Sequence, residues 1–107
     1  MRRGDIISVS LPRDYEPRPA LVIQSDDFAH LHSVTVAPLT SEIVDAAEQS
    51  RITVEPAPGT GLRVRSQVMI DKVSSLPRAK AGPVIGRVSE ADMGQVTRTL
   101  AFFFGLA

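Results

Sequence analysis

Residues 17–26 read PRPALVIQSD, so an arginine stands between two prolines just before an apolar run. Each proline fixes its own φ at about −65° and biases the residue before it toward an extended backbone, so Arg18 is restrained from both sides. A guanidinium held in a preset direction can bind two oxygens of a phosphate through its planar fork. The plainer interpretation is that Pro-Arg-Pro only ends a loop and begins an edge strand.

Further polar residues stand at or near the ends of expected strands: Thr40, Ser41, Asp71 and Lys72. Together with Arg18 they form a set suited to a phosphate. Hydroxyl groups can donate hydrogen bonds to its oxygens, and a carboxylate can take up a proton. Sequence spacing alone does not show that these side chains converge.

The two histidines are a weak signal for a metal. His30 and His32 would project from the same face of a strand, with Asp26 and Asp27 close by, but they fall in an expected loop. The chain contains no H-E-x-x-H, P-loop, G-x-G-x-x-G or G-x-S-x-G pattern, so zinc-protease, nucleotide-binding and α/β-hydrolase chemistry have no support. We expect neither a metal nor a cofactor.

The length and composition predict one domain over residues 1–107. A chain of 107 residues with 43% hydrophobic side chains can build one core but not two comfortable ones. It has no cysteine, which excludes disulfides and fits a reducing compartment. The first residues do not resemble a signal peptide and no apolar run is long enough to span a membrane, so we expect a cytoplasmic protein.

Charge is unevenly distributed although the formal net charge is zero. Residues 49–88 carry seven Lys or Arg and two Asp or Glu, a net charge of +5, whereas residues 1–48 carry four Arg and eight Asp or Glu, a net charge of −4. A basic middle segment could bind a polyanion. Alternatively, its charges pair with the acidic first half after folding.

Short apolar runs bounded by prolines and glycines predict about six strands. The expected strand regions are residues 4–12, 20–25, 33–41, 51–56, 62–76 and 83–89. In the long fifth region, we expect Leu62, Val64, Val68, Ile70 and Val73 to face inward. Pro38 predicts a kink or bulge, residues 41–50 a loop or one short helix, and residues 78–82 a basic loop.

The C-terminal residues change to a helical period. Ser89 is a good N-cap, the apolar residues that follow recur at three- and four-residue steps, and Gly105 is a stop signal. The inward stripe would be Met93, Val96, Leu100 and Phe103, and the neighbouring phenylalanines would serve as core or dimer contacts. Strands followed by one helix predict a mainly β fold, a small antiparallel barrel capped by a C-terminal helix.

Five segments in order give this chain a resemblance to a known family. They are MRRGDI, PRPALVIQSD, VTVAPLTS, SQVMIDK and GRVSEADM followed by a helix. The chain resembles the MazF/PemK family of bacterial toxins over nearly its whole length, more weakly at residues 42–50. RPALVI and VAPLTS are the most specific parts.

The resemblance implies an SH3-like β-barrel that works as a homodimer. It further implies a sequence-specific endoribonuclease acting on single-stranded RNA, the toxin half of a toxin–antitoxin pair, with a cognate antitoxin as partner. By motif position, Arg18 corresponds to the catalytic arginine and Thr40 to the catalytic threonine, while Asp71 sits where some members place a functional aspartate.

The chemistry that the resemblance implies needs no metal. A ribose 2′-OH attacks the adjacent phosphorus and leaves a 2′,3′-cyclic phosphate or a 3′-phosphate and a 5′-OH. Arg18 would stabilise the charge on the phosphoryl oxygens and Thr40 would orient the phosphate. The acceptor of the 2′-OH proton stays open between Glu16, Asp71 and Arg18. The expected RNA contacts are Arg13, Arg63, Arg65, Arg78, Lys80 and Arg87.

The sequence departs from the family pattern at three places. Met69 stands where some relatives have an arginine, and Lys72 follows Asp71 where they have a glutamine. The first loop, LPRDYEP, is shorter than in many relatives. Two other functions therefore stay in view: a CcdB-like toxin that binds DNA gyrase and cuts nothing, and an inactive module that binds RNA or an antitoxin.

Overall fold

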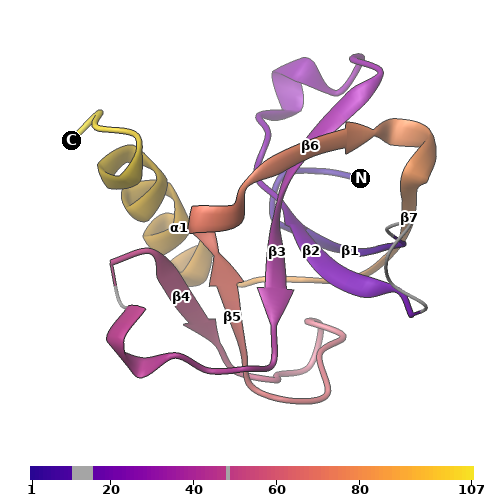
Figure 1. Ribbon diagram of the computed structural model, residues 1–107. Coiled ribbons are helices and arrows are strands. Elements are labelled where there is room, and N and C mark those ends of the chain that lie inside the picture. The colour runs from indigo at the N-terminus through magenta and orange to yellow at the C-terminus, as the bar shows by residue number, and fades with distance from the viewer. Residues whose placement is uncertain (11–15, 48) are drawn as a thin grey trace.

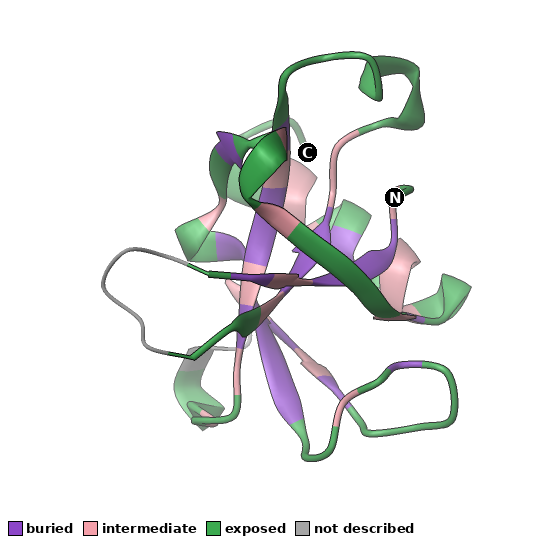
Figure 2. Ribbon diagram, turned by 90° about the vertical axis from the view of Figure 1, so that its right-hand side faces the viewer, coloured by how far each residue is buried: buried purple, intermediate pink, exposed green. Residues whose placement is uncertain are grey.

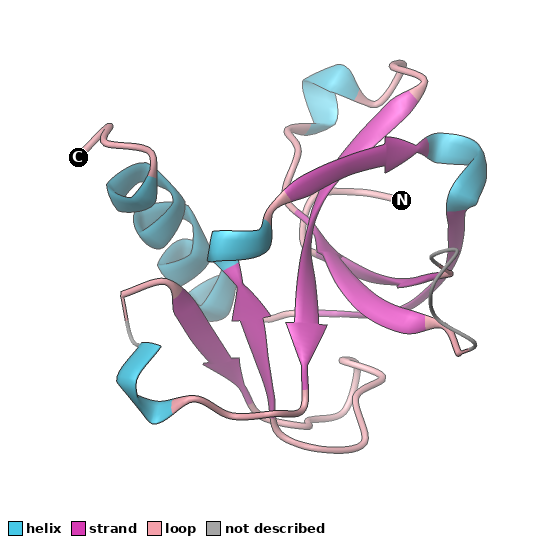
Figure 3. Cartoon of the chain, viewed as in Figure 1, coloured by secondary structure: helices cyan, strands magenta, loops and turns pink. Residues whose placement is uncertain are grey.

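Seven strands and one α-helix form the chain in the computed structural model, which describes residues 1–10, 16–47 and 49–107. The strands are β1 (Asp5–Val9), β2 (Arg18–Val22), β3 (Ser33–Thr40), β4 (Arg51–Val54), β5 (Ser66–Met69), β6 (Ser74–Pro77) and β7 (Ala81–Arg87), and the helix is α1 (Glu90–Phe103). Short 3-10 turns occur at η1 (Asp26–Phe28), η2 (Asp45–Ala47), η3 (Ile70–Lys72) and η4 (Arg78–Lys80). Figure 3 shows η3 and η4 at the two ends of β6.

All strand pairs are antiparallel, in the order β4-β5-β3-β2-β1-β7, with β6 paired to β3. β3 is central because its first half pairs with β6 and its end pairs with β5. Figure 1 shows β4 and β5 beside α1, with β6 and β7 on the other side of the molecule. The loop between β4 and β5 reaches across to β7, where the Arg87 N–H donates to the Gly59 carbonyl at 2.7 Å. The predicted mainly β, barrel-like fold with a C-terminal helix is confirmed.

The core consists of two apolar clusters, seen as the buried segments of Figure 2. One cluster joins the sheet to α1 and includes Ile6, Leu21, Leu39, Val68, Ile70 and Val96. The other lies among β1, β2, β3 and β6 and includes Ile7, Ala20, Val22, Val34, Val36 and Leu76. Successive residues of β1 and β2 thus enter different clusters, and so do Val36 and Ala37 of β3. This explains the apolar runs at these places, whereas β3 alternates up to Val36.

The helix begins as the sequence predicts. The Ser89 hydroxyl accepts a hydrogen bond from the Asp92 N–H at 3.1 Å, and Gly105 follows the last turn with a φ of +74°. Val96 is buried and Met93 and Leu100 pack against the core. Within the described residues, no helix combines the length and the apolar composition needed to span a membrane.

Phe103 does not face the core as predicted, because its side chain is 46% exposed. Phe102, Phe104 and Leu106 are exposed as well, and the rings of Phe103 and Phe104 meet edge to face at 5.5 Å between centroids. Figure 1 shows the reason: the last turn of α1 and the C-terminus extend away from the strands. We call Phe102, Phe103, Phe104 and Leu106 the C-terminal apolar patch.

The predicted long strand over residues 62–76 is wrong. Gly59 and Gly61 adopt φ of +93° and +71°, which turns the chain before β5 begins at Ser66, and η3 then separates β5 from β6. Val64 therefore lies in a loop and is 54% exposed rather than inward, while Val68 and Ile70 are buried.

Three smaller expectations have mixed outcomes. β3 runs through Pro38 without a register shift against β2, so no bulge occurs there, but the partner on its other edge changes from β6 to β5 at this point. In the described part of residues 41–50, the short 3-10 turn η2 takes the place of a longer helix, and the expected basic loop at 78–82 is η4 followed directly by β7.

An ion pair with a buried carboxylate joins β1 to β7. Asp5 is 6% exposed, and its carboxylate accepts from the Arg87 guanidinium and from the Arg2 N–H, both at 2.7 Å. Burial raises the pKa of Asp5, but these hydrogen bonds and the charge of Arg87 outweigh it, so the pKa lies below its ordinary value. Asp5 and Arg87 are also directly opposite in the strand register.

Candidate active site

A groove of about 900 Å³ opens at the end of the sheet where β2 begins and β3 ends. Residues from distant parts of the chain line it: the segment before and into β2, the end of β3, the loop before β5, and β7. Its polar lining comprises Glu16, Arg18, Thr40, Ser41, Arg63 and Ser66, and its apolar lining includes Leu39, Leu62, Val64 and Ile85.

The strand register explains why Arg18 and Thr40 meet. β2 and β3 pair with Ala20 opposite Pro38, and the same antiparallel register continued by two residues brings Arg18 opposite Thr40. Arg18 also pairs with Val9 on its other side, so its backbone belongs to the sheet. The flanking prolines and the paired strand both restrain the backbone of Arg18, which fixes where its side chain leaves the sheet.

Thr40 is held by its own loop. Its hydroxyl oxygen accepts a hydrogen bond from the Glu42 N–H at 3.1 Å, so the hydroxyl proton is left to point toward a groove ligand. Ser41 adds a second hydroxyl, and Glu16 adds a carboxylate on the side of Arg18. The groove thus combines a cation, two hydroxyls and a carboxylate, a set that can hold a phosphate and accept a proton.

The opposite wall depends on the close packing of two glycine-containing segments. A side chain at Gly61 would collide with the Ile85 carbonyl, so the loop before β5 can lie against β7 only with glycine there. The buried Thr60 hydroxyl donates to the Ala57 carbonyl at 2.9 Å and accepts from the Leu62 N–H at 3.2 Å. This wall presents the exposed Arg63 to the groove.

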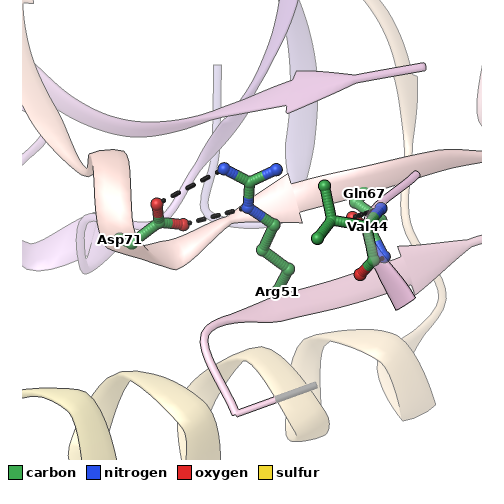
Figure 4. A network of polar contacts seen from close by, with 4 residues as sticks. All are labelled: Val44, Arg51, Gln67 and Asp71. Atoms are coloured by element: carbon green, nitrogen blue, oxygen red, sulfur yellow. Dashed lines mark hydrogen bonds and ion pairs between the residues drawn. The ribbon is translucent and has the colours of Figure 1, made fainter. Parts of the chain in front are cut away.

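Asp71 and Lys72 do not line the groove. They belong to η3, beyond the opposite end of β5 from Ser66. Figure 4 shows Asp71 bound to Arg51 of β4, with its two oxygens 3.2 and 3.4 Å from the guanidinium nitrogens. The structure therefore separates the Asp71 and Lys72 pair from the Arg18 and Thr40 pair.

Three of the expected phosphate contacts bind groups of the protein itself. Arg65 pairs with Glu55 at 3.0 Å, Arg87 pairs with Asp5, and Arg78 donates to the Leu31 carbonyl at 2.8 Å and to the Ser33 carbonyl. Lys80 is an exposed residue of η4, outside the groove lining. Arg13 lies outside the residues that the structure describes. Of the expected contacts that it does describe, Arg63 is the one in the groove lining.

Gln67 is a residue that the sequence analysis missed. Its side chain is buried on β5, directly opposite Thr40 in the register, and its amide binds both backbone groups of Val44. The sequence did offer a signal for Gln67, a glutamine inside an apolar strand, because a buried side-chain amide needs hydrogen-bond partners.

No group of three or more His, Cys, Asp or Glu is placed to hold a metal ion within residues 1–10, 16–47 and 49–107. His30 and His32 are both exposed on the segment that leads into β3.

Known proteins of similar sequence and shape decide the family. The family model of PemK-like, MazF-like toxins of type II toxin–antitoxin systems matches residues 2–104. This chain belongs to that family. A probable endoribonuclease MazF from Mycolicibacterium smegmatis is 45% identical over 109 residues, which cover 100% of this toxin and 99% of the relative.

Solved structures share the fold of this toxin. The Mycobacterium tuberculosis toxin MazF-mt6 superposes with a TM-score of 0.80 at 25% identity, covering 96% of this chain and 98% of that one. An endoribonuclease from a mycobacterial species, solved with its cognate antitoxin, gives a TM-score of 0.80 at 21% identity and covers 100% and 95%. A MazE–MazF structure from Deinococcus radiodurans gives a TM-score of 0.80 at 21% identity and covers 100% and 97%.

Proposed function

We propose that this toxin is a sequence-specific, metal-independent endoribonuclease that cuts single-stranded RNA. The observation that carries the proposal is the meeting of Arg18, Thr40 and Glu16 in one open groove. Membership of the MazF-like toxins and the 45% identity to a probable endoribonuclease support the same reaction class. The groove is open at the surface, which suits a flexible single strand whose phosphates must reach a fixed arginine.

The proposed reaction is an internal phosphoryl transfer. The ribose 2′-oxygen forms a bond to the adjacent phosphorus, the bond from phosphorus to the 5′-oxygen breaks, and a 2′,3′-cyclic phosphate and a 5′-OH result. Arg18 stabilises the negative charge on the non-bridging oxygens, and the Thr40 hydroxyl donates to one of them. Glu16 accepts the 2′-OH proton, since it is the carboxylate among the described residues that line the groove. The leaving 5′-oxygen takes a proton from water.

The proposal implies two protein partners. The first is a cognate antitoxin, as in the mycobacterial and Deinococcus complexes of similar fold. The second is another copy of this chain, for which the exposed C-terminal apolar patch is a suitable contact because large exposed apolar patches mark interaction sites. Sedimentation of the purified chain would report the expected homodimer. A soluble cytoplasmic location fits these partners.

The decisive experiment incubates the purified protein with a long single-stranded RNA in EDTA and maps the fragment ends. We expect discrete cuts with 5′-OH ends. Arg18→Ala should lower the rate roughly 100-fold or more, because it removes the donor that stabilises the transition state. Glu16→Gln should also lower the rate while leaving binding to an uncleavable 2′-O-methyl RNA nearly unchanged.

Each alternative function gives a different result. Binding to RNA without any cleavage by the wild-type protein would indicate the inactive binding module. Intact RNA together with growth arrest that persists in the Arg18→Ala variant would indicate a non-enzymatic toxin, with DNA gyrase as the next target to test.

A further inference from the structure

The side chain of Gln67 forms hydrogen bonds to the segment after Thr40 as the backbone of a neighbouring strand would. Its Oε1 accepts from the Val44 N–H at 3.0 Å and its Nε2 donates to the Val44 carbonyl at 3.2 Å (Figure 4). Gln67 is only 4% exposed. Both ends of its amide are therefore used, and both bonds go to the backbone of one residue.

Gln67 holds this segment at both ends. Its backbone lies opposite Thr40 in the β3–β5 pairing, and its side chain binds Val44 four residues later. Residues 41–43 consequently form a short arc closed on a single residue of β5. A short arc with both ends fixed has few conformations, so the groove residues at its start are restrained.

The arc also sets the direction of the Thr40 hydroxyl. The Glu42 N–H that donates to the Thr40 oxygen belongs to this arc, at 3.1 Å. If Val44 were released, the Glu42 amide could move and the Thr40 side chain would lose the contact that orients it. Ser41, the second hydroxyl of the groove lining, lies between these two points.

We propose that Gln67 is a positioning residue of the active site, which holds the arc of residues 41–43 so that the Thr40 and Ser41 hydroxyls face the phosphate bound by Arg18. This role rests on the proposed ribonuclease function. Gln67 lies outside the groove lining, so it acts through Thr40 and Ser41 rather than by contact with the substrate.

The chain offers a matched control for this clamp. Gln24 makes the same kind of double contact elsewhere: its Nε2 donates to the Phe28 carbonyl at 3.0 Å and its Oε1 accepts from the Thr35 N–H at 3.2 Å. Gln24 does not line the groove. Replacing either glutamine by methionine keeps the side-chain length and removes both hydrogen bonds.

The test compares Gln67→Met with Gln24→Met in RNA cleavage. For Gln67→Met we expect kcat to fall about 10- to 100-fold with KM within about threefold, because small misplacements of a reacting group cost rate more than binding. Gln24→Met should keep kcat within about twofold of wild type when both variants are folded at the assay temperature. Equal kcat losses in the two variants would overturn the positioning role.

A combined variant separates positioning from a general loss of structure. If Gln67 acts through Thr40 and Ser41, then Gln67→Met should change the rate of a protein that already carries Thr40→Ala and Ser41→Ala by less than about threefold. If the losses multiply instead, Gln67 does not act through these two hydroxyls and the proposal fails.

Hydrogen exchange tests the clamp without relying on cleavage. The Val44 and Glu42 amides should exchange faster in Gln67→Met than in wild type or Gln24→Met. Unchanged exchange at Val44 would show that the clamp does not restrain the arc, which overturns the proposal whatever the cleavage rate. If the wild-type protein cuts no RNA, the proposed function is wrong and the positioning role fails with it. Hydrogen exchange would still show whether Gln67 restrains the arc.

Discussion

The arginines of this toxin fall into two groups with different surroundings. Arg18 and Arg63 line the groove, whereas five others donate to acceptors inside the protein. Those five are Arg3, Arg51, Arg65, Arg78 and Arg87. Among the residues that the structure describes, Arg63 has no hydrogen-bond or ion-pair partner.

The comparison shows why a charge count along the chain overstates the RNA-binding surface. Residues 49–88 carry a net charge of +5, but several of their guanidiniums are bound to carboxylates or backbone carbonyls, as Figure 4 shows for Arg51. An arginine that already bonds a carboxylate must leave it before it can bind a phosphate. The expected pairing with the acidic first half holds for Arg87 and Asp5, whereas Arg51 and Arg65 pair with carboxylates of their own segment. Binding of a polyanion by this segment stays a prediction, for which Arg63 is the candidate contact in the groove lining.

The strongest test of this division is Arg87→Met, which should lower stability more than any other arginine substitution in residues 49–88. It leaves the buried Asp5 carboxylate with the Arg2 N–H alone. We expect a loss of about 1–2 kcal/mol in the free energy of unfolding, reduced from the usual cost because the Arg87 side chain is 44% exposed. Thermal unfolding should show a Tm lower by about 4–8 °C for each kcal/mol.

The effect of Arg87→Met should depend on pH in one direction. Because the pKa of Asp5 is lower in the folded protein than in the unfolded chain, its contribution is present above the unfolded pKa of about 4 and is lost as the pH falls through the folded value. The Tm difference between wild type and variant should therefore be full at pH 7 and shrink below about pH 4. The control is Arg65→Met, which breaks the exposed ion pair between Arg65 and Glu55. It should lower the free energy of unfolding by less than about 0.5 kcal/mol. A difference that stays constant down to pH 2 would contradict the assignment to Asp5.

A smaller effect is expected at Arg63, and on RNA binding rather than on stability. Arg63→Ala should weaken binding of a 2′-O-methyl RNA roughly fivefold, equivalent to about 1 kcal/mol, through loss of one phosphate contact. The slope of log affinity against log salt should become less steep by about 0.7. The matched control is Arg98→Ala on α1, which removes the same charge away from the groove lining. Equal losses in both variants would mean that overall charge, not the groove, attracts the RNA.

The sequence predicts local features of this fold well because their causes are local. The hydroxyl of Ser89 and the glycine at position 105 mark the ends of α1 within a few residues of chain, and the apolar runs of β1 to β3 reflect burial on both faces. The pairing of Arg18 with Thr40 needs one further fact, the register of β2 against β3. Once that register is known, the convergence of the RPA and PLTS motifs follows.

The remaining features depend on contacts between distant segments. Val64 lies in an apolar alternation that predicts an inward face, yet the turn at Gly59 and Gly61 carries it to the groove surface. Asp71 follows the same apolar strand region but forms an ion pair with Arg51 of β4 instead of entering the groove. Phe103 continues a helical stripe beyond the strands that could cover it. Periodicity states which residues could face a core, but not where the core ends.

The smallest effect on cleavage is expected at Asp71, which the family resemblance presents as a functional aspartate. Asp71→Asn should keep the cleavage rate within about threefold of wild type, because the carboxylate lies outside the groove lining and binds Arg51. Stability should fall by less than about 1 kcal/mol, since the Asp71 side chain is 32% exposed. Cleavage kinetics and thermal unfolding of the same preparation give both values.

Arg51→Met serves as the control for Asp71→Asn, since it breaks the same ion pair and leaves the carboxylate in place. If only Asp71→Asn lowers the rate by 100-fold, the carboxylate itself takes part in the reaction, and the groove must extend past Met69 when RNA is bound. If both variants lower it equally, the pair supports β5, the strand that also carries Gln67, from its Met69 end. Near-normal rates in both variants would leave Glu16 as the proton acceptor and assign the Arg51–Asp71 pair to joining β4 and η3.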